Sequence, residues 1–414
     1  MNNNRILLKS MLWNTVGSIS YLGCQWLIML LVAQNGNYDM TGNFSLAISV
    51  TNIFSAIALY GGMKSYQISD INDMYDNNVY ISTRIITSLG AILGCVIFIY
   101  IVDYSSSQIW IIIAYMIFKI EEAIIDVFQG IEQKLWRLDI VGKSLLIRAI
   151  ATLLVFVIGL KISNELIIPI ILMSLISLII WIIYDIRLCN KLAKLHLEIE
   201  LIKSYSLIKT CSPIFISSIF FNICSFMPRF FLEKNLGTDM LGIYASIATP
   251  TVIVQVLATL IFNPLIPIFT LHYEEKNIRK FKLLMIKCIC MIGVLGISAI
   301  VCSILFGKIF LQILFGAEMK SYVELLNPII ITTILTAIIW LLIGILTSIR
   351  RFTFMIVGNG IGSLVSIILS QPIINIYGMN GASISLIISQ IIMIVIMMFP
   401  IVNLDKLKNN MKGI

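Results

Sequence analysis

Four charged side chains lie within one apolar stretch of the sequence, residues 108–130. They are Lys119, Glu121, Glu122 and Asp126. A charged side chain at the centre of a membrane-spanning helix costs about 2.5–3.5 kcal/mol on insertion scales, so four of them need partners or water. Carboxylates and an ammonium group at this depth are suited to binding a charged ligand, or to joining helices as buried ion pairs.

The spacing of polar residues in this stretch predicts that they share one face of a helix. They recur at intervals of 4, 3, 4, 3 and 4 residues: Tyr115, Lys119, Glu122, Asp126, Gln129 and Gln133. Glu121 lies off this face by about 100°, and we expect it to meet a neighbouring helix. Two interpretations remain open. Lys119, Glu122 and Asp126 line a solvated cavity to which Lys119 gives positive potential, or they form a dry ion-pair network.

Two arginines in other apolar stretches are candidates for binding an anionic group. Arg148 lies one turn inside the stretch 144–161, and its alternative role is to reach the lipid headgroups with its long side chain. Arg229 follows Pro228, which weakens a helix locally, and its alternatives are pairing with Glu233 or reaching the outer interface. Arginine suits phosphate because its planar fork binds two oxygens at once. The candidate substrate-binding residues are Lys119, Glu122, Asp126, Arg148 and Arg229.

Other chemistries lack the residues that they need. His196 and His272 fall in polar connectors, and Cys288 and Cys290 point to opposite sides of a helix, so we expect no metal site. The sequence has no Gly-x-x-x-x-Gly-Lys loop for nucleotide phosphates. The predicted outer loops are too short for the catalytic groups of a membrane polymerase. We therefore expect no enzyme and no cofactor.

The elements that position these residues must be membrane-spanning helices. Of the 414 residues, 59% are hydrophobic and 12% are charged, whereas soluble domains are about half apolar and a quarter charged. The apolar runs are continuous, and a spanning helix needs about 20 apolar residues, so the sequence predicts an all-α polytopic membrane protein. We predict twelve spans: 11–34, 42–63, 83–102, 108–130, 144–161, 166–186, 208–232, 241–262, 284–306, 325–347, 353–371 and 381–402.

The distribution of lysine and arginine predicts that both termini face the cytoplasm. With the N-terminus inside, 22 of the 29 basic residues, Lys64 and Arg84 among them, lie in inner segments and four in outer segments. Basic residues gather on the cytoplasmic side of membrane proteins. The net charge of +8 is then explained by anionic lipid headgroups. We therefore expect membrane lipid, and no nucleic acid, as a partner.

The two halves of the sequence resemble each other. Asp39-Met40-x-Gly42-x-Phe44 recurs 200 residues later as Asp239-Met240-x-Gly242-x-Tyr244. Six spans in each half would relate the halves by an axis along the membrane normal, an arrangement that suits alternating access. We expect three parts: an N-terminal six-helix bundle over 1–187, an amphipathic cytoplasmic connector over 188–207 and a C-terminal six-helix bundle over 208–414.

Two motifs resemble a known family, the bacterial polysaccharide repeat-unit flippases of the O-antigen and capsule group. The first motif resembles the region between spans four and five of these flippases. It is the run Asp126-Val-Phe-Gln-Gly130 followed by Gln133, Arg137-Leu-Asp139, Lys143-Ser144 and Arg148. The flippases' region between spans seven and eight is similar to Pro228-Arg229-Phe-Phe-Leu-Glu233 followed by Gly237 and Gly242-x-Tyr244. Ala149 departs from the family pattern, in which glycine is common. The family is part of the superfamily of multidrug and oligosaccharidyl-lipid exporters.

The resemblance implies two six-helix bundles, related by a pseudo-two-fold axis, that meet in a V around a central cavity. It implies transport of an oligosaccharide repeat unit on undecaprenyl pyrophosphate from the cytoplasmic to the outer face of the bacterial plasma (inner) membrane. Polymerase and chain-length proteins of the same pathway would be partners. A cation-coupled multidrug exporter of the same superfamily and a membrane enzyme remain as alternatives. The multidrug exporter is expected to have an acidic residue in its first helix, and span 11–34 has none.

Overall fold

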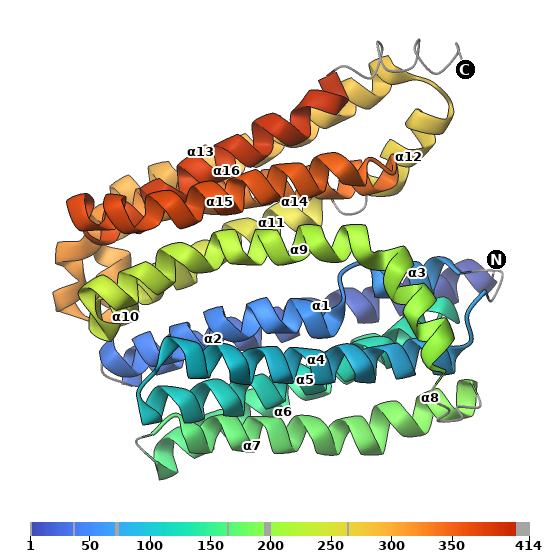
Figure 1. The fold of residues 1–414 in the computed structure, drawn as a ribbon, viewed down its shortest axis with the longest axis horizontal. Helices are drawn as coiled ribbons and strands as arrows, with labels where there is room; N and C mark the ends of the chain where they lie inside the picture. Colours follow the sequence, from blue (N-terminus) through green and yellow to red (C-terminus); the bar gives the residue numbers. More distant parts are fainter. Residues whose placement is uncertain are drawn as a thin grey trace. The chain divides into compact units, whose positions relative to one another are not determined.

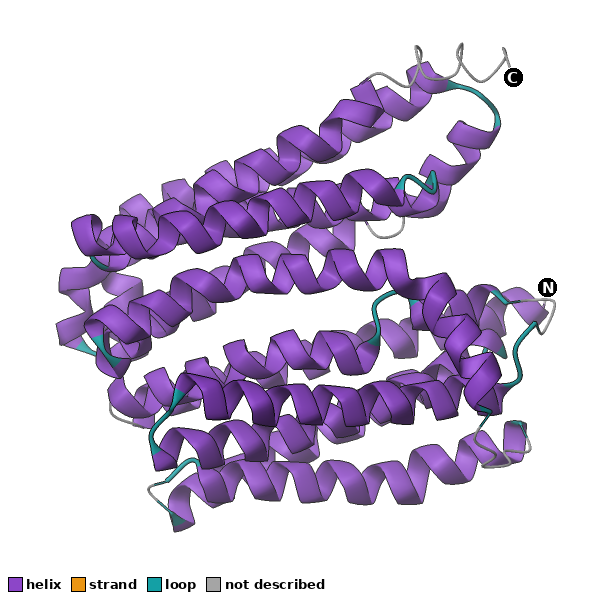
Figure 2. Cartoon of the chain, viewed as in Figure 1, coloured by secondary structure: helices purple, strands orange, loops and turns teal. Residues whose placement is uncertain are grey.

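The described chain is helical, and Figure 2 shows its helices joined by loops and turns. The computed structural model describes residues 2–35, 38–70, 74–163, 165–193, 200–262 and 265–402. Within these ranges no residue is in a β-strand, and eleven helical segments are long and apolar enough to cross a membrane. The predicted fold class, an all-α polytopic membrane protein, is confirmed.

The chain forms two compact units, Met1–Phe215 and Ile216–Ile414, and helix α9 (Leu201–Leu236) runs from the first into the second. The other helices of the first unit (Figure 1) are α1 (Asn2–Asn35), α2 (Tyr38–Leu59), α3 (Met63–Ser69), α4 (Asn77–Val102), α5 (Ser106–Lys134), α6 (Leu138–Ile162), α7 (Ile167–Ile180), the π-helical turn η1 (Trp181–Ile186) and α8 (Arg187–Leu192). Those of the second unit are α10 (Thr238–Ala248), η2 (Thr249–Thr251), α11 (Val252–Phe262), α12 (Ile266–Glu274), α13 (Ile278–Phe315), η4 (Ala317–Leu325), α14 (Leu326–Ser348), α15 (Phe352–Tyr377) and α16 (Met379–Val402).

All twelve predicted spans fall on helices. Eleven coincide with the apolar segments, and the twelfth falls on α5, whose 29 residues are long enough to cross a membrane but include six charged side chains. A helix with this many charges is too costly to expose to lipid and must face protein or water. In the first unit α5 packs against α2, α3, α4 and α7, so neighbouring helices surround it.

The second and eighth predicted spans are interrupted. After α2 ends at Leu59, Tyr60 and Gly62 have positive φ angles of 44° and 88°, which break the helix before α3 begins. In the second unit the 3₁₀ turn η2, which contains Pro250, separates α10 from α11. Proline interrupts the α-helix here because it lacks the backbone N–H that a continuous helix needs. The sequence patterns located both spans, and the breaks within them are seen in the structure.

Two glycines bring α1 and α6 into close contact. A Cβ atom on Gly17 would lie 2.1 Å from the carbonyl oxygen of Gly142, and a Cβ on Gly142 would lie 2.2 Å from the backbone of Trp13. Only glycine allows two helix backbones to approach this closely. Tyr21 on α1 and Arg148 on α6 follow these glycines along their helices, so the close packing positions both side chains.

The 200-residue repeat marks the same kind of element in both units. Helix α2 begins at Tyr38 and α10 begins at Thr238, directly before the repeated motif in each case. Thr51 and Thr251 also form the same contact, since each hydroxyl donates to the backbone carbonyl three residues earlier, at 3.2 and 2.8 Å. The predicted similarity of the two halves therefore extends to the start of this helix.

The second unit is centred on α14, which packs against α11, α13 and α16. Several of its buried polar side chains form hydrogen bonds inside the unit. The Asn359 side-chain amide on α15 donates to the carbonyl and hydroxyl oxygens of Ser217, at 3.1 and 2.8 Å, and Ser366 donates to the Cys224 carbonyl at 2.9 Å. These contacts join α15 to α9.

The connector predicted over 188–207 is only partly described. Helix α8 ends at Leu192 and α9 begins at Leu201, whereas residues 194–199, with Lys194 and His196, lie outside the described residues. The boundary between the two compact units falls between Phe215 and Ile216, inside α9.

Candidate functional site

The polar face of α5 is held by contacts to other helices of the first unit. Lys119 Nζ lies 2.7 Å from Glu122 Oε2, and the Tyr21 hydroxyl on α1 donates a hydrogen bond to Glu122 Oε1. The Lys119 ammonium also lies 5.6 Å from the centre of the Tyr115 ring. Both carboxylate oxygens of Glu122 are therefore engaged, one by a cation and one by a neutral donor.

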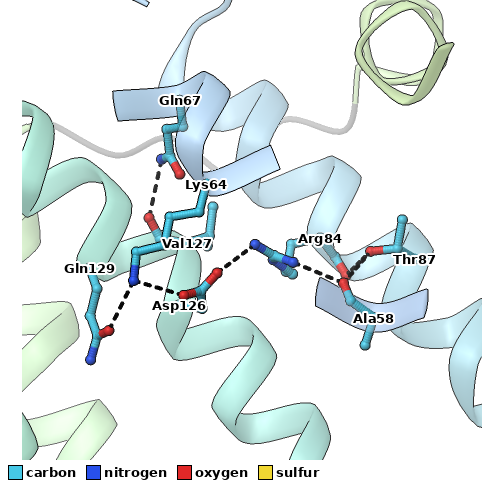
Figure 3. A network of polar contacts seen from close by, with 8 residues as sticks. All are labelled: Ala58, Lys64, Gln67, Arg84, Thr87, Asp126, Val127 and Gln129. Carbon is cyan, nitrogen blue, oxygen red and sulfur yellow. Dashed lines mark hydrogen bonds and ion pairs between the residues drawn. The ribbon is translucent and has the colours of Figure 1, made fainter. Parts of the chain in front are cut away.

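Asp126 binds two cations at once (Figure 3). Lys64 Nζ on α3 lies 2.8 Å from Asp126 Oδ1, and Arg84 Nη2 on α4 lies 2.9 Å from Asp126 Oδ2. Lys64 also donates to Gln129 Oε1 at 3.3 Å. The carboxylate thus joins α3, α4 and α5, and the group as a whole carries one excess positive charge.

The break after α2 supplies a second partner for Arg84. Arg84 Nη1 donates to the carbonyl oxygen of Ala58 at 3.0 Å, and the Thr87 hydroxyl donates to the same oxygen at 2.8 Å (Figure 3). Ala58 is in the last turn of α2, where backbone carbonyls lack donors from their own helix. Gln67 on α3 donates to the Val127 carbonyl at 3.1 Å, which fixes α3 on α5.

The structure gives Lys64 and Arg84 a contact that the sequence did not predict. The sequence interpretation counts both among the basic residues of inner segments, and in the structure Arg84 has no exposed surface and both residues ion-pair with Asp126. The signal in the sequence is that Arg84 lies inside the predicted span 83–102, where a charge needs a partner. The partner cannot be read from spacing, because it lies on another helix. The excess of basic residues on the predicted inner side remains large without them.

A cavity of about 210 Å³ lies beside these ion pairs in the first unit. Its walls come from α1, α2, α5 and α6. Two of the lining residues are apolar, Leu59 and Leu145, and five are polar: Tyr21, Glu122, Asp126, Gln129 and Arg148. A water molecule occupies about 30 Å³ in the liquid, so the cavity has room for several waters or a small anionic group.

Arg148 differs from the other cations of this site. Its side chain is 2% exposed, and its guanidinium carbon lies 5.6 Å from the centre of the Tyr21 ring, a cation–π contact. Among the described residues it has no ion-pair partner within 4.0 Å, and its Nε atom has no hydrogen-bond partner. Lys64, Arg84 and Lys119 are all ion-paired. Arg148 therefore presents a fork of donors at the cavity wall that is not held by a direct ion pair.

The structure brings together most of the predicted site residues. Glu122, Asp126 and Arg148 line the same cavity, and Lys119 pairs with Glu122 without lining it. The alternative in which Arg148 extends to the headgroups does not hold, because the side chain is buried. Glu121 meets a neighbouring helix as expected, since the Ser174 hydroxyl on α7 donates to its carboxylate.

Arg229 is in the second unit, on α9, and is half-buried. Tyr244 on α10 is its electrostatic neighbour, and the Tyr244 and Ser383 hydroxyls are hydrogen-bonded at 2.9 Å. The motif that contains Arg229 and the repeat that contains Tyr244 thus lie together in one unit.

Sequence analysis missed Tyr21 as well as Lys64 and Arg84. The polar residues of span 11–34 gave no pattern that singled out Tyr21, and its contact with Glu122 joins residues 101 positions apart in the chain. A tyrosine in a spanning helix does not indicate a binding role unless the residue opposite it is known, so the sequence contained no signal for this contact.

The fold is similar to those of known membrane transporters. The lipid II flippase MurJ, in an inward closed conformation, superposes with a TM-score of 0.73 at 13% identity, over 94% of this chain and 87% of that one. An inward-facing multidrug resistance MATE family transporter of the MOP superfamily superposes with a TM-score of 0.65 at 12% identity, over 96% and 99% of the two chains. The chain has the fold of these transporters.

The sequence comparison is more specific. The capsular polysaccharide biosynthesis protein CapF of Staphylococcus aureus is 26% identical over 404 residues, which are 94% of this chain and 98% of that protein. No protein-family model matches the chain. The resemblance predicted from the motifs is confirmed, since the chain is similar along nearly its whole length to a capsule protein and has the fold of MOP-superfamily transporters.

Proposed function

We propose that this protein is a flippase for undecaprenyl-pyrophosphate-linked oligosaccharide repeat units, which it moves from the cytoplasmic to the outer face of the membrane by alternating access. The similarity to CapF supports a role in capsular or O-antigen polysaccharide synthesis, and the similarity to a lipid II flippase supports a lipid-linked substrate. The observation that carries the proposal is the polar cavity with the buried, unpaired guanidinium of Arg148.

The charges around the cavity favour an anionic ligand. Arg148 lines the cavity, and Lys64, Arg84 and Lys119 pair with its two lining carboxylates, Glu122 and Asp126. This group has two positive charges in excess, not counting the buried carboxyl groups of Glu121, Glu132 and Asp185. A pyrophosphate group carries negative charge and must leave water to cross the membrane. Arginine offers it two parallel hydrogen bonds, while the lipid tail remains in the bilayer. In this proposal Arg148 binds the head group, and the ion-paired cations supply the surrounding positive potential.

Arg229 is proposed as a second cationic contact for the same head group or as part of the outer gate. It is in the second unit, which an alternating-access transporter needs to engage during its cycle.

We further propose that both termini are cytoplasmic in a bacterial plasma membrane, and that the polymerase and chain-length proteins of the same pathway are partners. Reporter fusions at Ser106 should read outside and fusions at Asn277 inside.

The proposal is tested with the purified chain in liposomes that contain a fluorescent undecaprenyl-pyrophosphate-linked saccharide. We expect Arg148→Gln to lower the flipping rate at least tenfold, and Arg148→Lys to restore only part of it because lysine lacks the fork. Arg279→Gln, an exposed arginine on α13, is the control and should flip at the wild-type rate. Unchanged flipping by Arg148→Gln would reject the role of this cavity.

A multidrug exporter is the second candidate, because the MATE-family transporters share the fold. The excess positive charge around the cavity argues against it, since cationic drugs would be repelled there. Efflux of a cationic dye from the same liposomes, sensitive to Arg148→Gln, would favour this candidate over the flippase.

A further inference from the structure

Two buried carboxyl groups of the first unit have no well-formed hydrogen bond or ion pair to any described residue. Glu132 on α5 and Asp185 in the π-helical turn η1 are both 0% exposed. All four of their carboxylate oxygens lack a hydrogen-bond partner among the described residues. Neither residue lines the cavity described above, and neither is used in the proposed binding of the head group. Such groups are rare in folded proteins and call for an explanation.

The two carboxylates belong to one cluster. Helix α5 packs against η1, and Asp185 is the main charged neighbour of Glu132. Single π-helical turns within α-helices are uncommon and occur frequently at functional sites. The hydroxyl of Ser144, also fully buried and without a well-formed hydrogen bond, lies beside Asp185.

Arg148 links this cluster to the cavity. It interacts electrostatically with both Glu132 and Asp185, and it has no ion pair within 4.0 Å among the described residues. The other charged groups that face Glu132 are Asp139, Lys64 and Arg137. Two neutral side chains near η1, Tyr184 and Cys189, also face the pair. Arg187 and Lys191 on α8 are exposed.

The protonation of the pair follows from its burial. An ionised carboxylate without hydrogen bonds is costly in a protein interior, and two adjacent carboxylates cannot both ionise cheaply. Arg148 can balance one negative charge. The donor set is too small for a metal, since the described residues contain no group of three or more His, Cys, Asp or Glu side chains that could hold one.

We propose that Glu132 and Asp185 form a proton-binding site that is linked to anion binding through Arg148. The pair retains one proton while Arg148 acts as its counterion. When an anionic group engages Arg148, the remaining carboxylate loses that counterion and takes up a second proton from bulk water. This linkage rests on the proposed function, whereas the site for the first proton does not.

The sign of the linkage is fixed by reciprocity. If anion binding promotes protonation of the pair, protonation must promote anion binding to the same extent. The affinity for an anion then rises as the pH falls, by up to about tenfold per pH unit for one linked proton. If proton and anion competed instead, the affinity for an anion would fall as the pH falls.

Infrared spectroscopy of the purified full chain, without substrate, tests the first proton. We expect a carboxylic acid carbonyl band at neutral pH in the wild type and in the control Glu165→Gln, which changes an exposed glutamate of the same unit. The double variant Glu132→Gln/Asp185→Asn should lose this band. A wild type without the band, or a folded double variant that keeps it fully, overturns the site.

A further variant keeps this test decisive if the double variant does not fold. Glu121→Gln removes the other buried carboxyl group of α5, the one bound by Ser174. An acid band that survives in Glu121→Gln supports the Glu132–Asp185 site, and a band that disappears assigns the proton to Glu121 and overturns it.

Calorimetry with sulfate tests the linkage, because sulfate does not itself titrate near neutral pH. Titrations in two buffers of different ionisation enthalpy should show uptake of about one proton per sulfate bound by the wild type, and none by Glu132→Gln/Asp185→Asn. Sulfate binding without proton uptake, or with proton release, overturns the linkage and leaves the proposed function intact. Absence of sulfate binding rejects anion binding by Arg148 and the linkage with it, whereas the infrared result stands by itself.

Discussion

Arg84 and Asp126 are joined by a 2.9 Å ion pair, although the Arg84 side chain has no exposed surface and Asp126 faces the cavity. The pair therefore has one side in the packed bundle and one side at the candidate site. Lys64 shares the same carboxylate at 2.8 Å. Asp126 consequently has two roles, since it neutralises a buried cation and forms part of the cavity wall.

Removing the charge of Asp126 should destabilise the protein. Asp126→Asn leaves Arg84 buried without a counterion, and breaking a buried pair in this way costs about 3–5 kcal/mol. We expect the variant to accumulate poorly and to unfold at a lower temperature in detergent. The double variant Arg84→Gln/Asp126→Asn should recover part of the loss, because the fully buried Arg84 charge is removed together with its partner, whereas Lys64, which is 27% exposed, can be solvated. Equal stability of Asp126→Asn and wild type would show that Arg84 reaches other counter-charges.

Access of water to the cavity can be measured by cysteine labelling in a background without the eight native cysteines. Gln129→Cys lines the cavity without removing a charge, whereas Ile125 is 1% exposed and off the polar face. A charged, membrane-impermeant thiol reagent should label position 129, and also positions 119, 122 and 126 where those variants accumulate, but not position 125.

Silence at all of these positions would favour a dry ion-pair network. The cavity would then be a packing feature, and Glu122 and Asp126 would lose their proposed contact with substrate. Labelling at position 125 together with 129 would instead indicate local unfolding of α5.

The sequence predicted what depends on one helix and missed what depends on two. The spacing from Tyr115 to Gln133 placed the charges on one face of α5, because helical geometry fixes such relations locally. The 200-residue repeat likewise marked the starts of α2 and α10. The contacts of Asp126 with Lys64 and Arg84 span 62 and 42 residues of chain, and no periodicity encodes which helices pack together.

The loop after α3 should make stability dependent on pH. Burial alone would raise the pKa of Asp70, but hydrogen bonds from the backbone N–H groups of Met74 and Tyr75 and from the Tyr80 hydroxyl lower the pKa below its usual value. A carboxyl group whose folded-state pKa is lowered stabilises the fold above its unfolded pKa of about 3.9, and this contribution disappears as the pH falls through the folded pKa.

Thermal unfolding between pH 6 and pH 3 measures this contribution. Asp70→Asn should lower the melting temperature at pH 6 and reduce its further decline toward pH 3. Asp103→Asn, at an exposed αL position where asparagine is tolerated, serves as the control and should keep the wild-type decline. A full acid-dependent decline in Asp70→Asn would assign that decline to other carboxylates.

Arg229 is the remaining predicted site residue, and its test separates charge from geometry. If Arg229 acts on the head group or the outer gate as proposed, we expect Arg229→Ala to abolish surface polysaccharide assembly in the host while the protein level stays near normal. Arg229→Lys should restore only part of the assembly, since lysine keeps the charge but lacks the planar fork that binds two phosphate oxygens. Full restoration by lysine would show that charge alone suffices, and activity in the alanine variant would remove Arg229 from the site.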